Sequence, residues 1–366
     1  MKTKKLNLIN RLIVNPYIQN KTLPEQVSQL LGLKLEYKTK EELINEFKNI
    51  PIENIFTLSK KTIFFTENKG RFLKKCPGSD GVICCNYYTI NSVTGCIFDC
   101  SYCILQHYIF NNPFITVFVN REKIKKEISD FLFSHKKIRV GTGELADSLA
   151  LDHITGESEF FLKLIKENSW EKNITFEFKT KSDNVDILIE NVKKYENCDI
   201  VVGFSVNIDL FSQKEEKYTS SIDDRLNAAS FLIENGIDIS IHFDPIIMLP
   251  QFLKNYKELI KKIFSKLNCE KIRWISMGGA RHTLALTSII RKRFPDSYLL
   301  LGEMFPSDKD NKLRYISSLR RIFYKELKRE IEKYYFEPPL YLCMEKDFMW
   351  KYLSLQVNNK VLRDIF

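Results

Sequence analysis

From about residue 86 onward, short apolar runs alternate with longer segments in which apolar residues recur every three or four positions. The short runs are rich in β-branched and aromatic residues, a composition that predicts strands. The predicted strands are Tyr87–Asn91, Phe114–Asn120, Ile138–Gly141, Ile174–Thr180, Ile200–Asn207, Ile237–Ile247 and Ile272–Met277.

The segments between most of these strands have the period of an amphipathic helix. A strand followed by a helix, repeated about six times, is typical of parallel strands joined by right-handed crossovers. A closed barrel needs eight such units, so this α/β pattern favours a partial barrel or an open doubly wound sheet. The predicted helices are Arg121–Ser134, Gly156–Asn168, Asn184–Tyr195, Ile222–Asn235, Phe252–Leu267 and His282–Arg293.

The flanking segments have a different character. Residues 1–85 mix short apolar stripes with charge, as in Glu25–Leu31 and Glu41–Phe47, which predicts a helical lead-in followed by a Cys-containing loop. Residues 301–366 are predicted to be a basic, mainly helical extension, in which the apolar run Pro339–Met344 could form a late strand. We therefore divide the chain into 1–85, 86–300 and 301–366.

Composition and charge narrow the class of protein. The 366 residues are 44% apolar and 28% charged, as in globular proteins, and 56 Lys and Arg against 46 Asp and Glu give a net charge of +10. This balance favours polyanionic partners without requiring them. The sequence contains neither a secretory apolar region nor a membrane-spanning run, so we expect no membrane association and a cytoplasmic location. Nine cysteines in a reducing compartment favour metal, cluster or catalytic use over disulfides.

Three of these cysteines, Cys96, Cys100 and Cys103, form a CxxxCxxC sequence. Three thiolates in one loop can bind three irons of a 4Fe-4S cluster and leave the fourth iron open. That iron can chelate S-adenosylmethionine and pass it an electron, which gives a 5′-deoxyadenosyl radical. Tyr102 would lie against the cofactor and take part in catalysis. The alternatives are a zinc site completed by His107 and three buried, unreactive thiols.

At these residues the sequence resembles the radical S-adenosylmethionine superfamily and, within it, the spore photoproduct lyase family of DNA-repair enzymes. The resemblance implies a partial (β/α)6 barrel, a 4Fe-4S cluster, S-adenosylmethionine, an electron donor such as flavodoxin or ferredoxin, and a thymine-dimer-type lesion in DNA as substrate. The matching stretches are Gly95–Gln106, Pro113–Asn120, Asp147–Thr155, Phe178–Val185, Gly203–Asn207 and Ser221–Ala229.

The resemblance also implies roles for polar residues at the carboxyl ends of the predicted strands. Superfamily members have a GGE-like segment that contacts the amino group of the cofactor, and Thr142 and Glu144 occupy it here. Lys181 and Ser205 match residues that contact the cofactor's carboxylate and ribose. Asn207 shares the strand end with Ser205, and strand ends face the ligand crevice in parallel sheets. An ordinary turn, a solvent-facing lysine and a helix-capping serine are the alternatives.

Two further groups of residues have candidate roles. His242 and Asp244 alternate on one strand and could line the substrate site, although a hydrogen-bonded core histidine explains His242 equally well. Cys343 could be a thiol that donates a hydrogen atom, or simply a small buried hydrophobe.

Cysteines and basic residues outside the triplet suggest two weaker sites. Cys76, Cys84 and Cys85 could bind a second cluster, with loop packing as the alternative. A helix is predicted over Asn311–Lys333, and its basic residues at spacings of 7, 4 and 3 could contact phosphates or form a solvated face. These residues are Arg314, Arg321, Lys325 and Lys328, with Tyr315 and Phe323 nearby.

The chain departs from the family in three places. In the family, a cysteine returns a hydrogen atom to the repaired thymine, and its aligned position here is Glu144; a tyrosine that assists is Ile104. The basic, aromatic DNA-inserting hairpin is replaced by Gly302–Lys312 and a long helix. Radical modification of another nucleic acid, a peptide or a small molecule is therefore an alternative, as is a zinc-bearing nucleic-acid-binding module.

Overall fold

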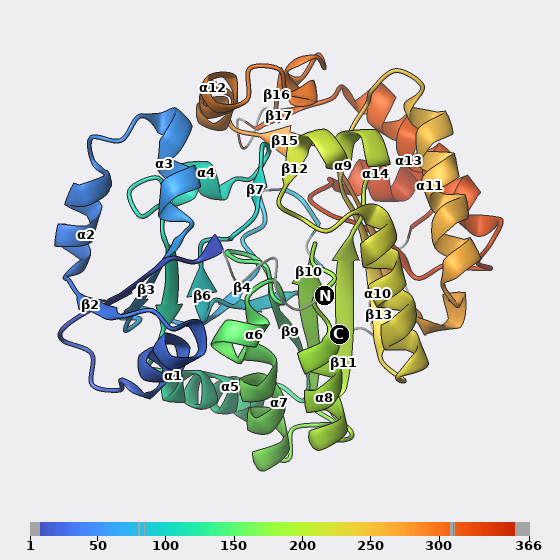
Figure 1. Ribbon diagram of the computed structural model, residues 1–366. Coiled ribbons are helices and arrows are strands. Elements are labelled where there is room, and N and C mark those ends of the chain that lie inside the picture. Colours follow the sequence, from blue (N-terminus) through green and yellow to red (C-terminus); the bar gives the residue numbers. More distant parts are fainter. Residues whose placement is uncertain (1–7, 80, 84, 308–309, 311, 356–366) are drawn as a thin grey trace.

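Two sheets organise the protein (Figure 1). The computed structural model describes residues 8–79, 81–83, 85–307, 310 and 312–355. The larger sheet has eight strands in the order β18-β14-β13-β11-β10-β9-β5-β4, and the second has five in the order β2-β1-β3-β8-β6. In the described part of the chain, no helix combines the length and the apolar composition needed to cross a membrane.

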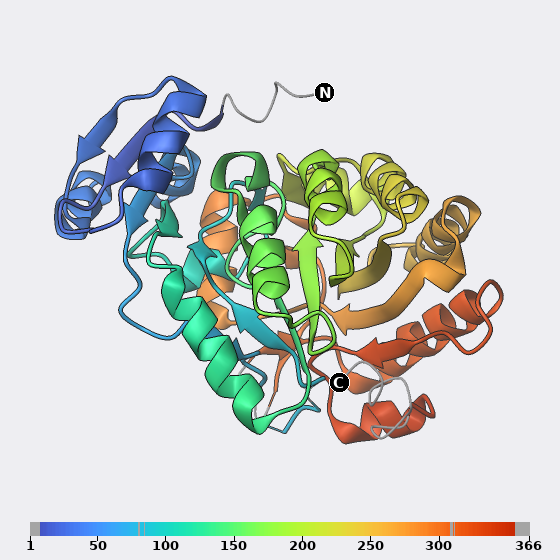
Figure 2. The same ribbon diagram turned by 90° about the horizontal axis from the view of Figure 1, so that it is seen from below.

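The eight-stranded sheet is a curled half-barrel with helices on its outer side (Figure 2). All its strands run parallel to their neighbours except β4, which is antiparallel to β5. Six strands in βα order confirm the predicted partial barrel, and the predicted late strand is present as β18. The strands are β4 (Leu73–Lys75), β5 (Tyr88–Ile90), β9 (Ile138–Thr142), β10 (Ile174–Thr180), β11 (Asp199–Ser205), β13 (Asp238–Ile246), β14 (Ile272–Gly279) and β18 (Leu340–Leu342).

The outer helices follow the strands as the periodicity predicts, with ends that differ by at most two residues. Their apolar stripes pack on the sheet, and the polar stripes face solvent. Ser221 and Thr283 begin two of them by accepting a hydrogen bond from a backbone N–H of the first turn. The helices are α5 (Glu122–Ser134), α7 (Glu157–Glu167), α8 (Asp186–Lys194), α10 (Ile222–Glu234), α11 (Phe252–Lys266) and α12 (Leu284–Arg293).

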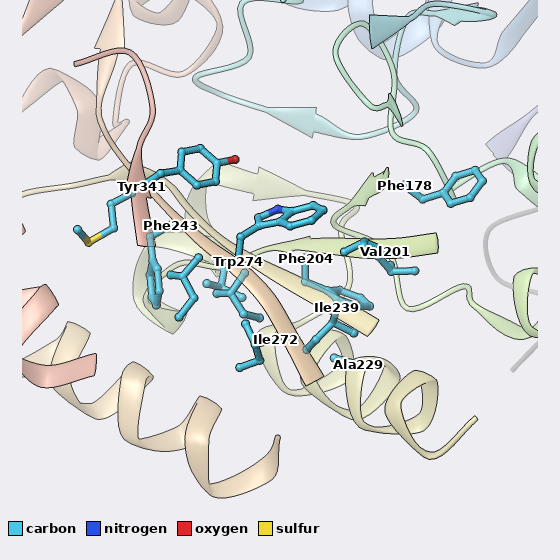
Figure 3. Packing of buried hydrophobic residues seen from close by; sticks show 14 of the residues in the cluster. Phe178, Val201, Phe204, Ala229, Ile239, Phe243, Ile272, Trp274 and Tyr341 are labelled. Atoms are coloured by element: carbon cyan, nitrogen blue, oxygen red, sulfur yellow. The ribbon is translucent and has the colours of Figure 1, made fainter. Parts of the chain in front are cut away.

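The main core lies between the half-barrel and these helices. Ile239 and Ile272 point from their strands toward Ala229 on α10, whereas Trp274 and Tyr341 point to the inner side of the sheet (Figure 3). All five residues are buried. Because side chains alternate along a strand, the sheet has one apolar face toward the helices and one face toward the barrel interior.

The lead-in predicted for residues 1–85 is helical only in part: the stripes Glu25–Leu31 and Glu41–Phe47 do form helices, but the segment also contributes three strands to the five-stranded sheet. Phe114–Asn120, predicted as a barrel strand, joins the same sheet by pairing with Thr62–Thr66. The five-stranded sheet therefore contains strands from both sides of the predicted boundary at residue 85. Its elements are β1 (Arg11–Val14), α1 (Thr22–Leu31), β2 (Leu35–Tyr37), α2 (Lys40–Phe47), α3 (Ile52–Ser59), β3 (Thr62–Thr66), β6 (Val93–Thr94) and β8 (Ile115–Phe118).

The C-terminal segment differs from the sequence predictions in two ways, a hairpin and the start of the long helix. A short hairpin pairs β16 (Phe305–Pro306) with β17 (Leu313–Arg314), and β17 also pairs with β15 (Arg281–His282), so a hairpin is present where we expected none. The long helix α13 (Ser317–Glu332) starts after this hairpin, and a second helix, α14 (Asp347–Tyr352), follows β18.

The predicted basic stripe is broken by the same hairpin. Arg314 lies in β17, is 8% exposed and forms an ion pair with Asp310 at 2.7 Å, so it does not share a helix face with Arg321 and Lys325. The neighbouring aromatic residues, Tyr315 and Phe323, are buried. The stripe therefore offers fewer phosphate contacts than the spacing predicted.

Candidate functional site

The three cysteines of the CxxxCxxC sequence lie on one tight loop, residues 94–103, which follows β6 and precedes β8, both strands of the five-stranded sheet. The loop begins at Gly95, whose N–H donates to the carbonyl of Leu145 at 2.8 Å. Gly95 has a φ of +88°, and a Cβ there would lie 2.8 Å from the carbonyl oxygen of Phe114. Only glycine combines this conformation with so close an approach, so Gly95 fixes where the loop enters the site.

The far end of the loop is closed by a short ladder and by one glutamine. Cys100 in β7 (Asp99–Cys100) pairs with Glu216 in β12 (Glu216–Lys217). The Nε2 of Gln106, in α4 (Leu105–Tyr108), donates to the carbonyls of Ser101 at 2.8 Å and Cys100 at 3.2 Å. The sequence analysis gave Gln106 no role, although it ends the stretch that carries the family resemblance.

The chemistry of these thiols fits an iron–sulfur cluster. Burial raises the pKa of the Cys96 thiol to about 12 and that of Cys100 well above its usual value, and a charge on Cys103 would raise both further. Thiols in such surroundings stay protonated unless a cationic centre stabilises the thiolates. Iron would do so, and a cluster needs each cysteine on a different iron rather than around one ion.

A zinc site with His107 as its fourth ligand is not formed. In the ranges that the structure describes, no three His, Cys, Asp or Glu side chains surround a point that could hold a single metal ion. His107 is exposed. For the proposed second cluster, Cys84 lies outside the described residues, so that set stays a prediction.

A pocket lies directly beside Cys96. Its lining includes Asn91, Gly95, Cys96, Thr142 and Asp147. The Oγ1 of Thr142 donates to Ser148 at 2.7 Å, which fixes its side chain at the end of β9. The structure therefore brings the predicted cofactor contact Thr142 to the same pocket as the first cysteine of the triplet.

Glu144 is held in place by two donors from the neighbouring strand β5 and the turn after it. The Oγ1 of Thr89 and the Nδ2 of Asn91 donate to its Oε2 at 2.7 and 2.8 Å. Among the described residues, the other carboxylate oxygen has no such partner, so it can accept a hydrogen bond from a ligand ammonium group.

Lys181 lies behind the loop, at the end of β10. Asp147 fixes this end by accepting from the N–H of Lys181 and the Oγ1 of Thr180, both at 2.7 Å. The Nζ of Lys181 is 5.7 Å from the centre of the Tyr102 ring. The structure thus places Lys181 next to the cysteine loop, whereas its contact with the cofactor's carboxylate stays a prediction.

Tyr102, a residue of the cysteine loop, is packed against an aromatic ring and a buried acidic residue. Its ring stacks on Phe211 with the ring centres 5.7 Å apart, and its hydroxyl donates to Glu216. Burial raises the pKa of Tyr102 well above its usual value, and the charge of Glu216 adds to this. These contacts fix the ring, whereas its contact with the cofactor stays a prediction.

Ser205 is the last residue of β11, and Asn207, two residues beyond it, is bound to the scaffold. Ser205 is half-buried at the strand end, where its carbonyl accepts from Arg225 at 2.8 Å. Asn207 is 1% exposed; its Nδ2 donates to Pro245 and its Oδ1 accepts from the hydroxyl of Tyr256. We therefore leave Asn207 out of the cofactor site proposed below.

A buried ion pair, which the sequence did not indicate, also supports the cysteine loop. Arg225 and Glu216 form a 2.6 Å pair whose side chains are 0% and 1% exposed. The same Glu216 accepts from Tyr102, and the same Arg225 binds the end of β11. Arg225 lies on α10, within the matching stretch Ser221–Ala229, but Glu216 directly follows α9 (Asp209–Glu215), outside every matching stretch, so no local signal pairs the two residues.

The barrel interior contains a buried polar network centred on Glu177. Its carboxylate accepts from the side chains of four residues on three strands and forms a 3.6 Å ion pair with Lys179. Both Glu177 and Arg139 have side chains that are 0% exposed. The four donors are Arg139 at 3.0 Å, Ser240 at 2.9 Å, His242 at 2.8 Å and Trp274 at 3.0 Å.

His242 is thus a hydrogen-bonded core histidine. Besides Glu177, its ring contacts the hydroxyl of Ser276 at 2.6 Å, and burial lowers its pKa. Asp244, two residues farther along β13, instead pairs with Arg281 at 3.0 Å. Of the two residues predicted to line the substrate site, Asp244 is the one nearer the carboxyl end of β13.

Cys343 follows β18 and lies beside that pair. The guanidinium of Arg281 is 3.6 Å from its Sγ, and its N–H donates to the carbonyl of Met277 at 2.8 Å. Burial raises the pKa of the Cys343 thiol to about 12, so the group is a protonated thiol. A sulfur that carries a hydrogen therefore lies at the strand ends, on the opposite edge of the half-barrel from the cysteine loop.

Comparisons with known proteins agree on one family. The family model described as spore photoproduct lyase matches residues 17–338. The spore photoproduct lyase of Bacillus subtilis is 24% identical over 303 residues, which cover 78% of this chain and 86% of that protein. That of Clostridium acetobutylicum is also 24% identical, over 218 residues; the match spans 63% of the relative's length and 59% of this chain.

Solved structures show the same fold. A spore photoproduct lyase variant with bound AdoMet and dinucleoside spore photoproduct has a TM-score of 0.76 and 22% identity, covering 91% of this chain and 98% of the other. A spore photoproduct lyase complexed with dinucleoside spore photoproduct has a TM-score of 0.77, 21% identity and the same coverage.

Proposed function

Because this chain belongs to the spore photoproduct lyase family, we propose that it is a radical S-adenosylmethionine enzyme acting on a thymine-dimer-type lesion in DNA. The observation that carries the proposal is the juxtaposition of the cysteine loop with the carboxyl ends of the parallel strands, where Thr142, Glu144 and Lys181 converge. The related structures bound to AdoMet and to dinucleoside spore photoproduct support both the cofactor and the substrate class. The cytoplasmic location stays a prediction.

Each residue at the strand ends has a task in this proposal. Cys96, Cys100 and Cys103 would hold the 4Fe-4S cluster, which together with S-adenosylmethionine supplies a 5′-deoxyadenosyl radical by one-electron cleavage. Glu144 would accept a hydrogen bond from the ammonium group of the cofactor, with Thr142 beside it. Lys181 and Ser205 would contact its carboxylate and ribose.

We expect a Glu144→Gln substitution to weaken S-adenosylmethionine binding. The neutral amide loses the charge-assisted hydrogen bond to the ammonium, a loss of ~1.5 kcal/mol or more and roughly tenfold or more in Kd. The glutamine also brings an NH2 group, which is a hydrogen-bond donor, into a site where Thr89 and Asn91 are already donors. Equilibrium binding to the reconstituted enzyme measures the change.

The iron content of the Glu144→Gln variant should stay at the wild-type value, because Glu144 is not a cluster ligand. Unchanged cofactor affinity at full iron content would show that Glu144 does not contact the cofactor.

Cys343 is the residue we propose as hydrogen-atom donor, because Glu144 occupies the family's donor position. Its S–H bond would break as a C–H bond forms on the thymine radical, and one electron from the added reductant with one proton from the solvent would restore the thiol. Arg281, held by Asp244, fixes the sulfur at the strand ends.

The Cys343→Ala variant should still cleave S-adenosylmethionine but form repaired thymine at least about tenfold more slowly, equivalent to ~1.4 kcal/mol of barrier. Cys198→Ala is the matched control, since Cys198 lies elsewhere, near the carbonyl of Leu162. Chromatographic quantification of both products separates the two steps. Normal thymine yield from Cys343→Ala would assign the donor role to another residue.

The function as a whole is tested with S-adenosylmethionine, dithionite and dinucleoside spore photoproduct under anaerobic conditions. Release of thymine dinucleoside together with cofactor cleavage supports the lyase activity. Cofactor cleavage without repair would reject it and favour radical modification of another nucleic acid, a peptide or a small molecule, an alternative that Glu144 and Ile104 already suggest.

A further inference from the structure

The outer side of the cysteine loop carries a group of exposed cations that the proposed reaction does not use. Lys214 and Lys217 belong to α9 and β12, and Arg291 and Lys292 to the last turn of α12; all four are exposed. We call this group the outer basic face. These elements lie at the same end of the molecule as β7 (Figure 1).

Aromatic contacts join the two parts of this face. The Nζ of Lys214 is 4.1 Å from the ring centre of Tyr298, and that of Lys217 is 4.9 Å from the ring centre of Phe294. Phe294 directly follows α12. The lysines of α9 and β12 are thereby held against the segment that carries the α12 cations, so the charges form one surface.

The outer basic face lies directly over the cluster loop. Lys217 pairs in register with Asp99, the residue before Cys100. Asp99 does not offset the outward charge, because Lys60 and Arg293 bind its carboxylate at 3.1 and 2.9 Å.

Of the acidic residues on these segments, Asp209 is paired with Lys262, and Asp296, between Phe294 and Tyr298, is exposed and offsets one of the four cations. Glu215 and Glu216 are 1% and 4% exposed. Glu215 accepts hydrogen bonds from Ser297 and Tyr298, and Glu216 is paired with Arg225. The surface above Cys100 is therefore positive.

We propose that the outer basic face docks an acidic one-electron carrier protein, of the flavodoxin or ferredoxin class, that reduces the cluster. This inference rests on the proposed function. One electron leaves the reduced carrier and enters the oxidised cluster, and no atom is transferred. Complementary charge increases the rate of encounter and orients the partner, and a carrier seated here stands next to the β7 strand that holds Cys100.

A nucleic acid could also bind a basic face, but the proposed substrate residues point elsewhere. Asp244, Arg281 and Cys343 lie at the strand ends of the half-barrel, on β13, β15 and the segment after β18, whereas the outer basic face is on α9, β12 and α12.

The test is the binding of purified flavodoxin, measured by titration at low ionic strength. Lys214→Glu combined with Lys217→Gln should weaken binding at least about tenfold, and added salt should reduce the difference between variant and wild type. Gln is used at position 217 so that no second carboxylate faces Asp99. Lys163→Glu with Lys254→Gln is the matched control, since it changes the net charge equally on exposed residues of α7 and α11.

Cluster reduction, followed by electron paramagnetic resonance, gives a second readout. Reduced flavodoxin should reduce the Lys214→Glu/Lys217→Gln variant at least about tenfold more slowly than wild type, while dithionite reduces both alike. Equal loss of flavodoxin binding in the control variant would overturn the docking face. So would loss of DNA affinity with flavodoxin binding unchanged. Failure of dithionite to reduce the wild-type protein would instead contradict the proposed function, and the binding titration, which needs no cluster, would still decide the docking face.

Discussion

Replacing Cys100 by alanine is expected to abolish both cluster assembly and S-adenosylmethionine cleavage. Three thiolates are the whole protein ligand set in our proposal, and a cluster that loses one of them has two open irons and is not retained. Anaerobic reconstitution followed by iron and sulfide analysis measures the first effect. Formation of 5′-deoxyadenosine measures the second, and we expect none. Cys96→Ala and Cys103→Ala should behave in the same way.

The protein itself should stay folded in the Cys100→Ala variant. The loop is also held by the carbonyl contacts of Gln106, the pairing with Glu216 and the turn at Gly95, none of which uses the Cys100 thiol. Cys269→Ala, in the turn before β14, is a matched control that should keep full iron content. Wild-type iron content in Cys100→Ala with an intact fold would show that this thiol is not a ligand.

The second large effect is expected at Glu177, where a Glu177→Gln substitution should destabilise the fold by about 3–5 kcal/mol. The amide removes the charge that Arg139 and Lys179 require inside the barrel, at a position 0% exposed. It also places an NH2 group among donors, including the indole of Trp274. Chemical denaturation of the two proteins measures the difference in the free energy of unfolding.

The exposed ion pair Lys163–Glu167 provides the control for this experiment. A Glu167→Gln substitution should change the unfolding free energy by about 0.5 kcal/mol or less, because the pair is solvated. If Glu177→Gln were equally mild, the charges of Arg139 and Lys179 would be compensated by other groups.

Acid should have the same effect as the Glu177→Gln substitution. The charges of Lys179, Arg139 and His242 hold the pKa of Glu177 well below its usual 4.5, against the opposing effect of burial. The stabilisation from this carboxylate is therefore complete above about pH 4.5 and is lost as the pH falls toward the depressed pKa. Unfolding curves for wild type and Glu177→Gln should converge in that acidic range.

Much of the half-barrel could be predicted because its signals are local. Strands such as Ile174–Thr180 and helices such as Phe252–Lys266 each carry a full period of apolar residues, and their alternation determines the βα order. The cysteine triplet is local in the same sense, since its spacing alone indicates cluster chemistry.

The remaining features depend on contacts between distant residues. Arg11–Val14 is too short a strand to stand out beside amphipathic helices, and it forms a sheet by pairing with Leu35–Tyr37 and Thr62–Thr66. The two-residue strands of the β16–β17 hairpin have no readable period, so Arg314 was assigned to a helix. Glu177 accepts from Arg139 and Trp274, 38 and 97 residues away, and Glu216 accepts from Tyr102, 114 residues away, and no spacing rule reveals such contacts.

The central claim is that Cys96, Cys100 and Cys103 hold an iron–sulfur cluster with one iron open to S-adenosylmethionine. The most direct test is electron paramagnetic resonance of the anaerobically reconstituted, dithionite-reduced wild-type protein, recorded before and after S-adenosylmethionine is added. The account predicts about four irons and four sulfides per chain and a cluster signal that changes when the cofactor binds. A protein without iron and sulfide, or a cluster signal that the cofactor leaves unchanged, would contradict it.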